Sequence, residues 1–523
     1  MIGTLVFGNR GIAKAGGGMA TQAEKLARSL EALAVVLAAG GGAVRARDVS
    51  RTHRARLVEA GFLREVMKGW YVPSQPDQPV GESTSWYFSY WGFCADYLEA
   101  RFGDGWCLSP EQSLMLHAGN RTVPGQLVVR CPRGDNAAVM LPHATSLLSV
   151  RSSLPPVDAR TVVDGLRVYR PAAALSAVAK DFFTTHETDA RAALAMVRDA
   201  SEVLPVLLER GHSTIAGRLA GAFANSGRER IAADIEQAMR AAGHVVRRAD
   251  PFARASLISP VDAEPPHVRR LRLMWHGMRD VAAAHFPAAP AGPIDADTYL
   301  RLVDDAYVSD AYHSLSIEGY QVSRDLVARI REGRWCPDSE ERDRDQRHAL
   351  AAKGYWQSLQ QVRRSLARVL AGENPGVVAD QDHGAWYREL VGPEVTAGLR
   401  RPADLAGYRD GTVLIRQSRH IPPAAAAVRD LMPVFFELLG TETDPAARAV
   451  LGHFVFVYIH PYPDGNGRVG RFLMNVMMAA GGYPWTIIPV ERRSVYMEAL
   501  EQASTAGDVA PFARMLGELV ARA

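Results

Sequence analysis

The chain has 523 residues, of which 47% are hydrophobic and 22% are charged. A domain usually takes about 100–200 residues, so this length predicts three or four domains with enough apolar side chains for several cores. The composition excludes a disordered, collagenous or low-complexity protein. The formal net charge is +3, from 60 Lys and Arg against 57 Asp and Glu, so any strongly basic surface must be local.

The cysteines and the lack of a long apolar run indicate the compartment. No Cys-x-x-Cys spacing occurs, which argues against a zinc ribbon or a disulfide scaffold and suits a reducing cytosol. The stretch 473–490 is interrupted by glycines and prolines, and it lacks the roughly 20 continuous apolar residues that a bilayer requires. We therefore expect a cytoplasmic protein without membrane contact. The cysteines are Cys94, Cys107, Cys131 and Cys336.

The N-terminal region has the outline of a winged helix-turn-helix. Apolar residues recur at helical spacing, and Ser50 is a good N-cap for the last of three expected helices. Two short strands joined by a turn at Lys68-Gly69 follow. The expected helices cover 24–37, 46–48 and 51–60, and the strands lie within 62–72.

The third helix and the wing carry a local excess of positive charge. Between residues 45 and 68, seven basic side chains stand against three acidic ones, an excess of 7 − 3 = +4. This excess predicts phosphate contacts with DNA through residues 45–72. A winged helix that docks another protein, or that is purely structural, is the alternative. The basic residues are Arg45, Arg47, Arg51, Arg54, Arg56, Arg64 and Lys68, and the acidic ones are Asp48, Glu59 and Glu65.

The region that follows the winged helix mixes strand-like runs, at 126–131 and 162–169, with Ala-rich helices, and contains no metal-ligand or nucleophile constellation. Together with the winged helix it resembles the AbiEi-type antitoxins of bacterial toxin–antitoxin systems, on the pattern of the helix end at 57–63 and the wing Lys68-Gly69-Trp70-Tyr71. The predicted domains are a winged helix at 19–75, an α+β middle domain at 81–251, a linker with a helix at 256–298, and a helical domain at 299–523.

One stretch, 460–471, combines the groups that phosphate chemistry needs. A predicted helix delivers His460 at its C-terminal end, and the unperturbed pKa of a histidine suits a general base. A turn with two glycines leads into a helix N-terminus, whose unpaired N–H groups cradle anions. Arg468 and Arg471 can each fork to phosphate oxygens, and Asp464 is a hard oxygen ligand for Mg²⁺. The two helices cover about 445–459 and 468–479.

This stretch, His-Pro-Tyr-Pro-Asp-Gly-Asn-Gly-Arg-Val-Gly-Arg, resembles the signature HxFx(D/E)GNGRxxR of the Fic family, with Tyr462 in place of the usual Phe. The pair Gly467-Arg468 is similar to AMP-transferring members and differs from the Doc kinase branch, where Lys replaces this Gly. The resemblance implies transfer of AMP from ATP to a Ser, Thr or Tyr hydroxyl of a target protein, with His460 as the base and Mg²⁺ on Asp464. It also implies nucleotide binding by Asp464, Gly465, Asn466, Gly467, Arg468, Val469, Gly470 and Arg471.

Two further segments continue the family pattern. The run from Gly407 to Pro423 resembles the Fic flap, a β-hairpin that would register an extended target segment by strand addition. An ordinary hairpin is the alternative. The resemblance implies that Tyr496 lines the adenine pocket, whereas Ser504 stands where the family has an Asn that contacts the base, which leaves the base open. The flap residues implied in nucleotide binding are Val413, Leu414, Ile415 and Arg416.

A helix predicted over 307–319 ends in Ser314-Leu-Ser-Ile-Glu318-Gly319, which matches the Fic inhibitory motif (S/T)xxxE(G/N). Glu318 can pair with Arg471 and so occupy the charge that should hold the γ-phosphate. The position of this motif, N-terminal to the catalytic one, is similar to the class II arrangement and implies autoinhibition through Ser314 and Glu318. In some relatives the same Glu activates a water that removes AMP, so the reverse reaction stays open.

We therefore predict a mainly α protein, with an all-helical Fic core and a β-hairpin flap behind a winged helix and an α+β domain. The leading hypothesis is an autoinhibited protein adenylyltransferase with ATP as substrate and Mg²⁺ as cofactor. The alternatives are a transcriptional regulator that senses nucleotide without turnover, and a Fic enzyme that transfers another phosphate-containing group. The expected partners are a target protein with a hydroxyl side chain, DNA, and a second copy in a homodimer.

Overall fold

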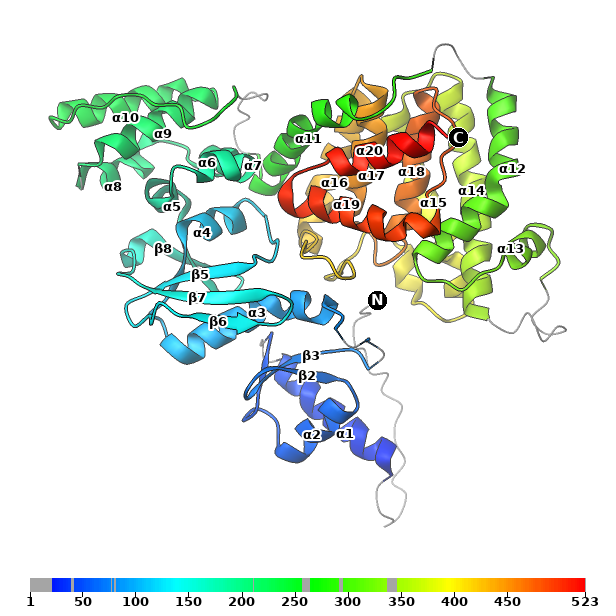
Figure 1. The fold of residues 1–523 in the computed structure, drawn as a ribbon, viewed down its shortest axis with the longest axis horizontal. Coiled ribbons are helices and arrows are strands. Elements are labelled where there is room, and N and C mark those ends of the chain that lie inside the picture. The colour runs from blue at the N-terminus through cyan, green and yellow to red at the C-terminus, as the bar shows by residue number, and fades with distance from the viewer. Residues whose placement is uncertain are drawn as a thin grey trace. The chain divides into compact units, whose positions relative to one another are not determined.

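The computed structural model describes residues 21–38, 42–76, 78–79, 81–209, 211–255, 264–290, 295–335 and 346–522. The chain divides into two compact units. The N-terminal unit comprises Ile2–Arg270 with Leu414–Ile421, and the C-terminal unit comprises Leu271–Val413 with Pro422–Ala523. The protein is mainly helical, as predicted, and within the described ranges every strand lies in the N-terminal unit (Figure 1).

The N-terminal unit begins with a winged-helix outline that differs from the prediction in one element. Residues 46–48 form a turn and not a short helix, because the Asp48 carboxylate accepts from the backbone N–H of Arg45 at 2.8 Å and closes the chain tightly before the next helix. Ser50 caps that helix, as predicted, by accepting from His53 N. The elements are α1 (Gln22–Ala38), β1 (Val44–Arg45), α2 (Arg51–Glu59), β2 (Leu63–Met67) and β3 (Trp70–Pro73).

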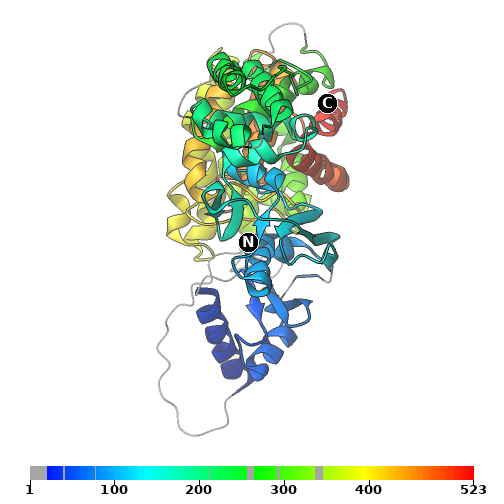
Figure 2. The ribbon, with the colours of Figure 1, turned by 90° about the vertical axis from the view of Figure 1, so that its left-hand side faces the viewer.

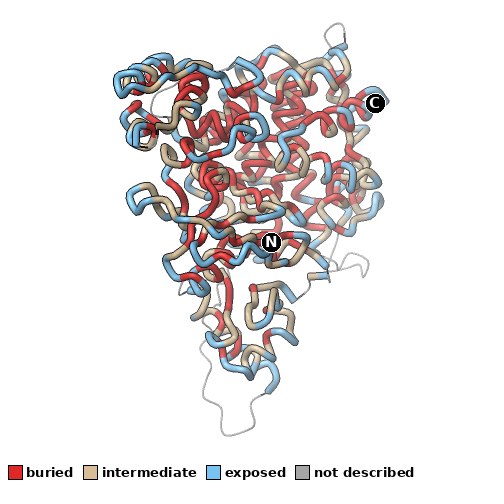
Figure 3. Tube along the Cα trace, turned by 60° about the vertical axis from the view of Figure 1, so that its left-hand side comes forward, coloured by how far each residue is buried: buried red, intermediate tan, exposed pale blue. Residues whose placement is uncertain are grey.

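The three strands of this part pair antiparallel in the order β1-β3-β2. Helices α1 and α2 pack on each other, in dark blue in Figure 2. Their common core is small, and the part of the tube next to the grey N-terminal trace is largely intermediate or exposed (Figure 3). Its fully buried apolar residues are Leu33, Val44, Val49, Leu57 and Leu63.

The next part of this unit is an α+β structure. A four-stranded sheet has the order β4-β5-β7-β6, in which β5 and β7 run parallel and the outer pairs run antiparallel. Aromatic residues of α3, among them Trp86, Tyr90 and Phe93, pack with Leu127, Val129 and Leu147 of this sheet in one core. The elements are α3 (Thr84–Phe102), β4 (Cys107–Leu108), α4 (Pro110–His117), β5 (Gln126–Cys131), β6 (Ala138–Leu141), β7 (Thr145–Arg151), and a hairpin of β8 (Arg160–Val163) and β9 (Leu166–Tyr169).

Short helices complete the N-terminal unit around a second core of mostly small and aliphatic side chains. Asp189 in this core accepts from Asn120 at 2.9 Å and from Arg270 at 2.7 Å, so its buried charge is paired. The helices are α5 (Pro171–Ala177), α6 (Phe182–Thr185), α7 (Glu187–Met196), α8 (Leu204–Glu209), α9 (Ser213–Asn225) and α10 (Glu229–Ala241).

The C-terminal unit is a helical bundle. The long helices α14 and α15 pack closely because Gly354 brings their backbones together: a Cβ there would lie 2.0 Å from the carbonyl oxygen of Leu390. The helices are α11 (Pro266–Ala284, from Leu271 on), α12 (Ala296–Ile317), α13 (Arg324–Arg331), α14 (Gln346–Leu370), α15 (Pro375–Thr396), α16 (Ala425–Thr441), α17 (Pro445–Ile459), α18 (Asn466–Ala480), α19 (Arg493–Ala506) and α20 (Ala510–Val520).

Helices α17 and α18 form the centre of this bundle and carry the residues of the 460–471 stretch. Both are buried on nearly all sides, as expected of apolar helices inside a bundle. Asp444 caps α17 by accepting from Ala447 N at 2.8 Å, which confirms the predicted start of this helix. Gly470 lets α18 approach α17, because a Cβ there would lie 3.0 Å from Val457.

Candidate active site

The loop between α17 and α18 begins at His460, which takes a left-handed backbone conformation (φ 53°, ψ 59°) and so ends α17. Its ring nitrogen Nδ1 lies 3.1 Å from the carbonyl oxygen of Val457. A carbonyl only accepts, so Nδ1 carries the proton and Nε2 keeps a lone pair. Burial lowers the pKa of His460 to about 4, so the neutral, proton-accepting form persists at neutral pH.

The N-terminus of α18 follows Gly465, whose φ of 79° makes the sharp turn into the helix. Arg468 and Arg471, 1% and 4% exposed, come from its first turns. Within the described part of the chain, Arg468 Nε and Nη1 and Arg471 Nη1 have no hydrogen-bond partner. Buried guanidinium donors without partners are costly, and they indicate a place for an anion.

Asn466 bonds the backbone of the loop through both ends of its side chain. Its side chain oxygen accepts from Tyr462 N at 2.9 Å, and its side chain nitrogen donates to Tyr462 O at 2.8 Å. Asn466 is 1% exposed and both ends of its side chain are used, so it holds the loop closed. The ring of Tyr462 stacks on Tyr387 with centroids 3.8 Å apart, which anchors the same loop to α15.

Asp464 is surrounded by positive charge. Its carboxylate is bonded by Arg400 and lies 3.7 Å from Nη2 of Arg468. Although burial raises the pKa of Asp464, the charges of Arg468 and Arg400 outweigh it and hold that pKa well below its usual range. The carboxylate stays ionised and is a suitable hard ligand for Mg²⁺.

Mg²⁺ commonly takes one or two carboxylates and completes its shell with water and phosphate oxygens. Asp464, beside the buried donors of α18, matches such a donor set. Within the described ranges no three His, Cys, Asp or Glu side chains converge as an all-protein metal site would require. The side chain of Asp464 is 32% exposed, so a cation can reach it.

Glu318, directly after α12, reaches α18. Its Oε1 accepts from Nη2 of Arg471 at 2.8 Å, and a Cβ at Gly467 would lie 2.2 Å from the same oxygen. Arg471 also donates to the Ser314 hydroxyl at 2.8 Å and to the Ser314 carbonyl at 3.0 Å. The inhibitory-motif residues and the second arginine of the 460–471 stretch therefore lie together. The helix itself is longer than predicted, from Ala296 to Ile317.

The predicted β-hairpin flap does not form. None of the residues from 407 to 423 lies in a strand, since they make turns and bends without ladder partners. Leu414, Ile415 and Arg416 belong to the N-terminal unit, and Val413 belongs to the C-terminal unit. Their implied contact with nucleotide stays a prediction.

Arg409, at the start of the same segment, is a residue whose role the sequence did not reveal. It donates from Nε to the carbonyl of His460 at 2.8 Å, and its backbone N–H donates to Pro461 O at 2.9 Å. It is 2% exposed and holds the end of α17. An arginine 51 positions before the histidine has no local spacing that would signal this contact.

Tyr496 does not lie at an open surface. It is 1% exposed on α19, and its hydroxyl is bonded to Nε2 of His453 at 2.7 Å. The ring is packed inside the helical core, and its contact with adenine stays a prediction. Ser504, on the same helix, is half-buried.

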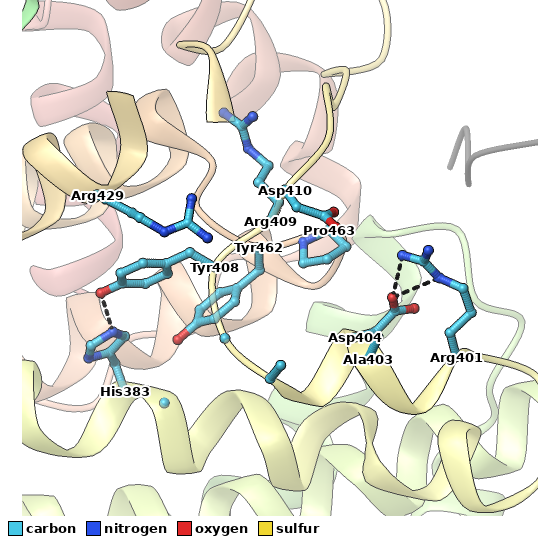
Figure 4. Close-up of a pocket in the computed structure, with 13 residues that line it drawn as sticks. His383, Arg401, Ala403, Asp404, Tyr408, Arg409, Asp410, Arg429, Tyr462 and Pro463 are labelled. Carbon is cyan, nitrogen blue, oxygen red and sulfur yellow. Dashed lines mark hydrogen bonds and ion pairs between the residues drawn. The ribbon is translucent and has the colours of Figure 1, made fainter. Parts of the chain in front are cut away.

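Beside the loop lies a cavity of about 520 Å³, shown in Figure 4. Tyr462 and Pro463 line it from the loop, and His383 lines it from α15. The hydroxyl of Tyr408 bonds Nε2 of His383 at 2.9 Å, and Arg429 also lines the cavity, from the first turns of α16 (Figure 4).

Comparisons with known proteins show what this site is similar to. Residues 385–478 match the model of the Fic/DOC family. A protein adenylyltransferase Fic of Nematostella vectensis is 26% identical over 423 residues, which cover 78% of this chain and 92% of that protein. The protein adenylyltransferase Fic of Drosophila willistoni is 29% identical over 222 residues. These cover 42% of this chain and 41% of that protein, so this chain spans about two fifths of the length of the Drosophila relatives.

Among solved structures, Fic-1 (residues 134–508) from C. elegans is similar at 20% identity and a TM-score of 0.36, over 60% of this chain and 88% of that one. The match of residues 385–478 takes in His460, Asp464 and both arginines of α18. Residues 385–478 are therefore similar to the Fic/DOC family, and the loop between α17 and α18 lies within the matched part of the chain.

Proposed function

We propose that this chain is a protein adenylyltransferase, which transfers AMP from ATP to a hydroxyl group of a target protein. The observation that carries the proposal is the pairing of a neutral histidine with buried, unpartnered arginine donors at a helix N-terminus. Relatives at 26% and 29% identity are protein adenylyltransferases by name, which supports the same transfer here.

In the proposed reaction, Nε2 of His460 takes the proton of the target hydroxyl. The oxygen attacks the α-phosphorus of ATP, the bond from that phosphorus to the bridging oxygen breaks, and pyrophosphate leaves. Arg468 and the N–H groups at the start of α18 would hold the phosphates in position and neutralise their charge. Mg²⁺ on Asp464 would supply further charge neutralisation on the phosphate oxygens.

We further propose that the enzyme is autoinhibited by Glu318. The carboxylate pairs with Arg471 at 2.8 Å and lies over Gly467, so it uses a guanidinium that a terminal phosphate would need. A phosphate there would also meet the negative charge of the carboxylate. The hydroxyl of Ser314 accepts a hydrogen bond from Nε of Arg471 and so helps to hold the guanidinium beside Glu318.

The test is label transfer from α-³²P-ATP with Mg²⁺ to proteins of a host lysate and to the chain itself. Glu318→Gly is expected to raise labelling at least about tenfold, since one ionic interaction of about 1.4 kcal/mol changes an equilibrium by that factor. Glu318→Gly/His460→Ala is expected to lose about 10²–10⁴-fold of it, as removal of a general base does.

Glu332→Gly is the matched control, because Glu332 follows α13 as Glu318 follows α12 but is exposed and pairs only locally with Arg334. This variant should label as the wild type does. No labelling in any variant, with ATP binding retained, would favour the nucleotide-sensing regulator. Label from γ-³²P-ATP, or from UTP in preference to ATP, would favour transfer of another group, and loss of label from a pre-labelled target would indicate AMP removal.

For the N-terminal unit we propose DNA binding as a second function, with phosphate contacts made by three exposed basic residues. Arg47, Arg51 and Lys68 are exposed on the turn, on α2 and on the wing. Arg47 lies 3.9 Å from Asp48, but its side chain is 73% exposed. The other basic residues of this region are held by the fold: Arg45 pairs with Asp48, and Arg54, Arg56 and Arg64 donate to backbone carbonyls.

Binding of a fluorescent DNA duplex should weaken with Arg51→Ala across all sequences, and the slope of log K against log salt should shrink by about 1. Arg28→Ala removes an exposed cation of α1 and should leave the slope unchanged. Equal slopes for both variants would favour the protein-docking or structural role of the winged helix.

A further inference from the structure

Arg400 is held between two carboxylates in the C-terminal unit, and one of them is the candidate metal ligand. Its Nε bonds Glu394 and its Nη2 bonds Asp464. The side chain is 9% exposed, and that of Glu394 is 6% exposed. Burial lowers the pKa of the Arg400 guanidinium, but the charges of Asp464 and Glu394 outweigh it and raise that pKa above its usual range.

A divalent cation and a guanidinium need the same thing from Asp464, which is an ionised carboxylate oxygen. The oxygen Oδ2 is already bonded to Arg400 and lies 3.7 Å from Arg468. We propose that Arg400 holds Asp464 in the metal-free protein and that a divalent cation competes with Arg400 for this carboxylate. This inference rests on the proposed function, because it assigns the metal to Asp464.

The second carboxylate makes the displacement feasible. A buried arginine that lost its only partner would carry a penalty of several kcal/mol. Arg400 keeps Glu394 after it leaves Asp464, so its charge is never left unpaired. The cation in turn gains a carboxylate that has lost one of its two neighbouring positive charges, since Arg468 remains.

The segment at the end of α12 also contacts Glu394, the second partner of Arg400. Tyr320, two residues after Glu318, donates its hydroxyl to Glu394 at 3.4 Å, and its ring lies 5.0 Å from the Arg468 guanidinium carbon. The segment that places Glu318 beside Arg471 therefore also supports Glu394. The conformation in which Glu318 pairs with Arg471 is thus the same one in which Arg400 occupies Asp464.

The experiment measures Mn²⁺ binding without nucleotide, by the loss of the free-Mn²⁺ EPR signal in titrations of the full chain. Each variant is paired with its own Asp464→Asn form, and the difference gives the binding that depends on Asp464. Arg400→Gln should tighten this binding about tenfold, since it removes a buried positive charge beside the carboxylate. Arg401→Gln is the matched control and should change nothing, because Arg401 is 54% exposed at the side chain and pairs with Asp404.

A second variant should change Mn²⁺ binding in the opposite direction. Glu394→Gln leaves Arg400 with Asp464 as its single carboxylate, so Asp464-dependent Mn²⁺ binding should weaken. The weakening should be smaller in Arg400→Gln/Glu394→Gln, because the competing guanidinium is gone. If Arg400→Gln does not melt cooperatively, the result of Glu394→Gln decides.

The proposal is overturned if Arg400→Gln weakens Mn²⁺ binding or leaves it unchanged, which would make Arg400 a support that positions Asp464 for the metal. The readout does not depend on transfer. A tightened Mn²⁺ affinity without any labelling from α-³²P-ATP would therefore refute the adenylyltransferase proposal and keep this one, whereas labelling with unchanged Mn²⁺ affinity would do the reverse.

Discussion

His460 combines two properties that a general base needs, and both come from its place at the end of α17. The carbonyl of Val457 selects the tautomer with a free Nε2, and burial favours the neutral ring. An ordinary histidine, with a pKa near 6.5, would lose most of its basic form at pH 5.5.

We expect the transfer rate of Glu318→Gly to stay nearly constant from pH 7.5 to pH 5.5. The base titrates with a pKa of about 4, so protonation removes it only as the pH falls towards that value. Single-turnover labelling across this range, under saturating ATP, measures the effect. A decline centred near pH 6.5 would show that the base is more solvated than the structure has it.

Asn466 and Asn475 make the same clamp at two places on α18. The first bonds both backbone groups of Tyr462, and the second bonds both backbone groups of Thr486, at 2.7 and 3.0 Å. Each alanine variant leaves a buried N–H and a buried C=O without partners. We expect each to lower the unfolding free energy by about 2 kcal/mol, measured by urea denaturation.

The two variants should differ in activity. Asn466→Ala frees the loop that carries Asp464, so it should lose transfer at temperatures where it remains folded, whereas Asn475→Ala should keep it. Equal activities would mean that the stack of Tyr462 on Tyr387 is sufficient to hold the loop.

At the scale of elements, α11 is joined to the turn between α16 and α17 through one buried carboxylate. Glu442 accepts from Trp275 at 3.2 Å, from Arg279 at 2.7 and 3.0 Å, and from Asp444 N at 2.9 Å. The Arg279 side chain is 33% exposed, which limits the cost of losing its partner.

Glu442→Ala should therefore lower the unfolding free energy by about 2 kcal/mol, below the 3–5 kcal/mol of a fully buried pair. Glu437→Ala is the control, since it breaks an ion pair of α11 with α16, at 2.6 Å, in which the carboxylate is 53% exposed. An exposed pair of this kind is worth about 0–1 kcal/mol. Thermal denaturation followed by circular dichroism compares the two.

The element-level predictions succeeded where local signals decide. The strand at 126–131 is confirmed with its predicted bounds, and α17 begins after its Asp444 cap. The short helix at 46–48 and the flap hairpin were wrong. A backbone contact from Asp48 closes 46–48 into a turn, and residues 407–423 lie in no strand, so neither expected element forms.

At the scale of the whole molecule, no described helix has both the length and the apolarity needed to cross a bilayer. The C-terminal unit nevertheless buries several charges, and one of them makes its stability depend on pH. Asp310 on α12 accepts from the Tyr355 hydroxyl at 2.8 Å, and burial raises its pKa to about 6 against 3.8 for the free side chain.

An acid whose pKa is raised by folding binds more protons in the folded state between the two pKa values. Its contribution to the unfolding free energy therefore falls as the pH rises from about 4 to about 6, by roughly 3 kcal/mol for a shift of about two units. Asp310→Asn removes this loss. We expect the melting temperature of the variant relative to the wild type to increase between pH 4.5 and pH 7.5, and a constant difference would contradict the raised pKa.

The sequence alone determined the motif loop, the helices on both sides of it, and the pairing of Glu318 with Arg471, because each depends on residue types at short spacing or on a known family pattern. It could not reveal Arg400, Glu394, Arg409 or the role of Asn466. Arg400 and Arg409 act through contacts with positions 64 and 51 residues away, where a side chain has no periodicity or spacing to mark it. Only packing of the bundle decides which buried charge meets which, since each must find a partner once water is excluded.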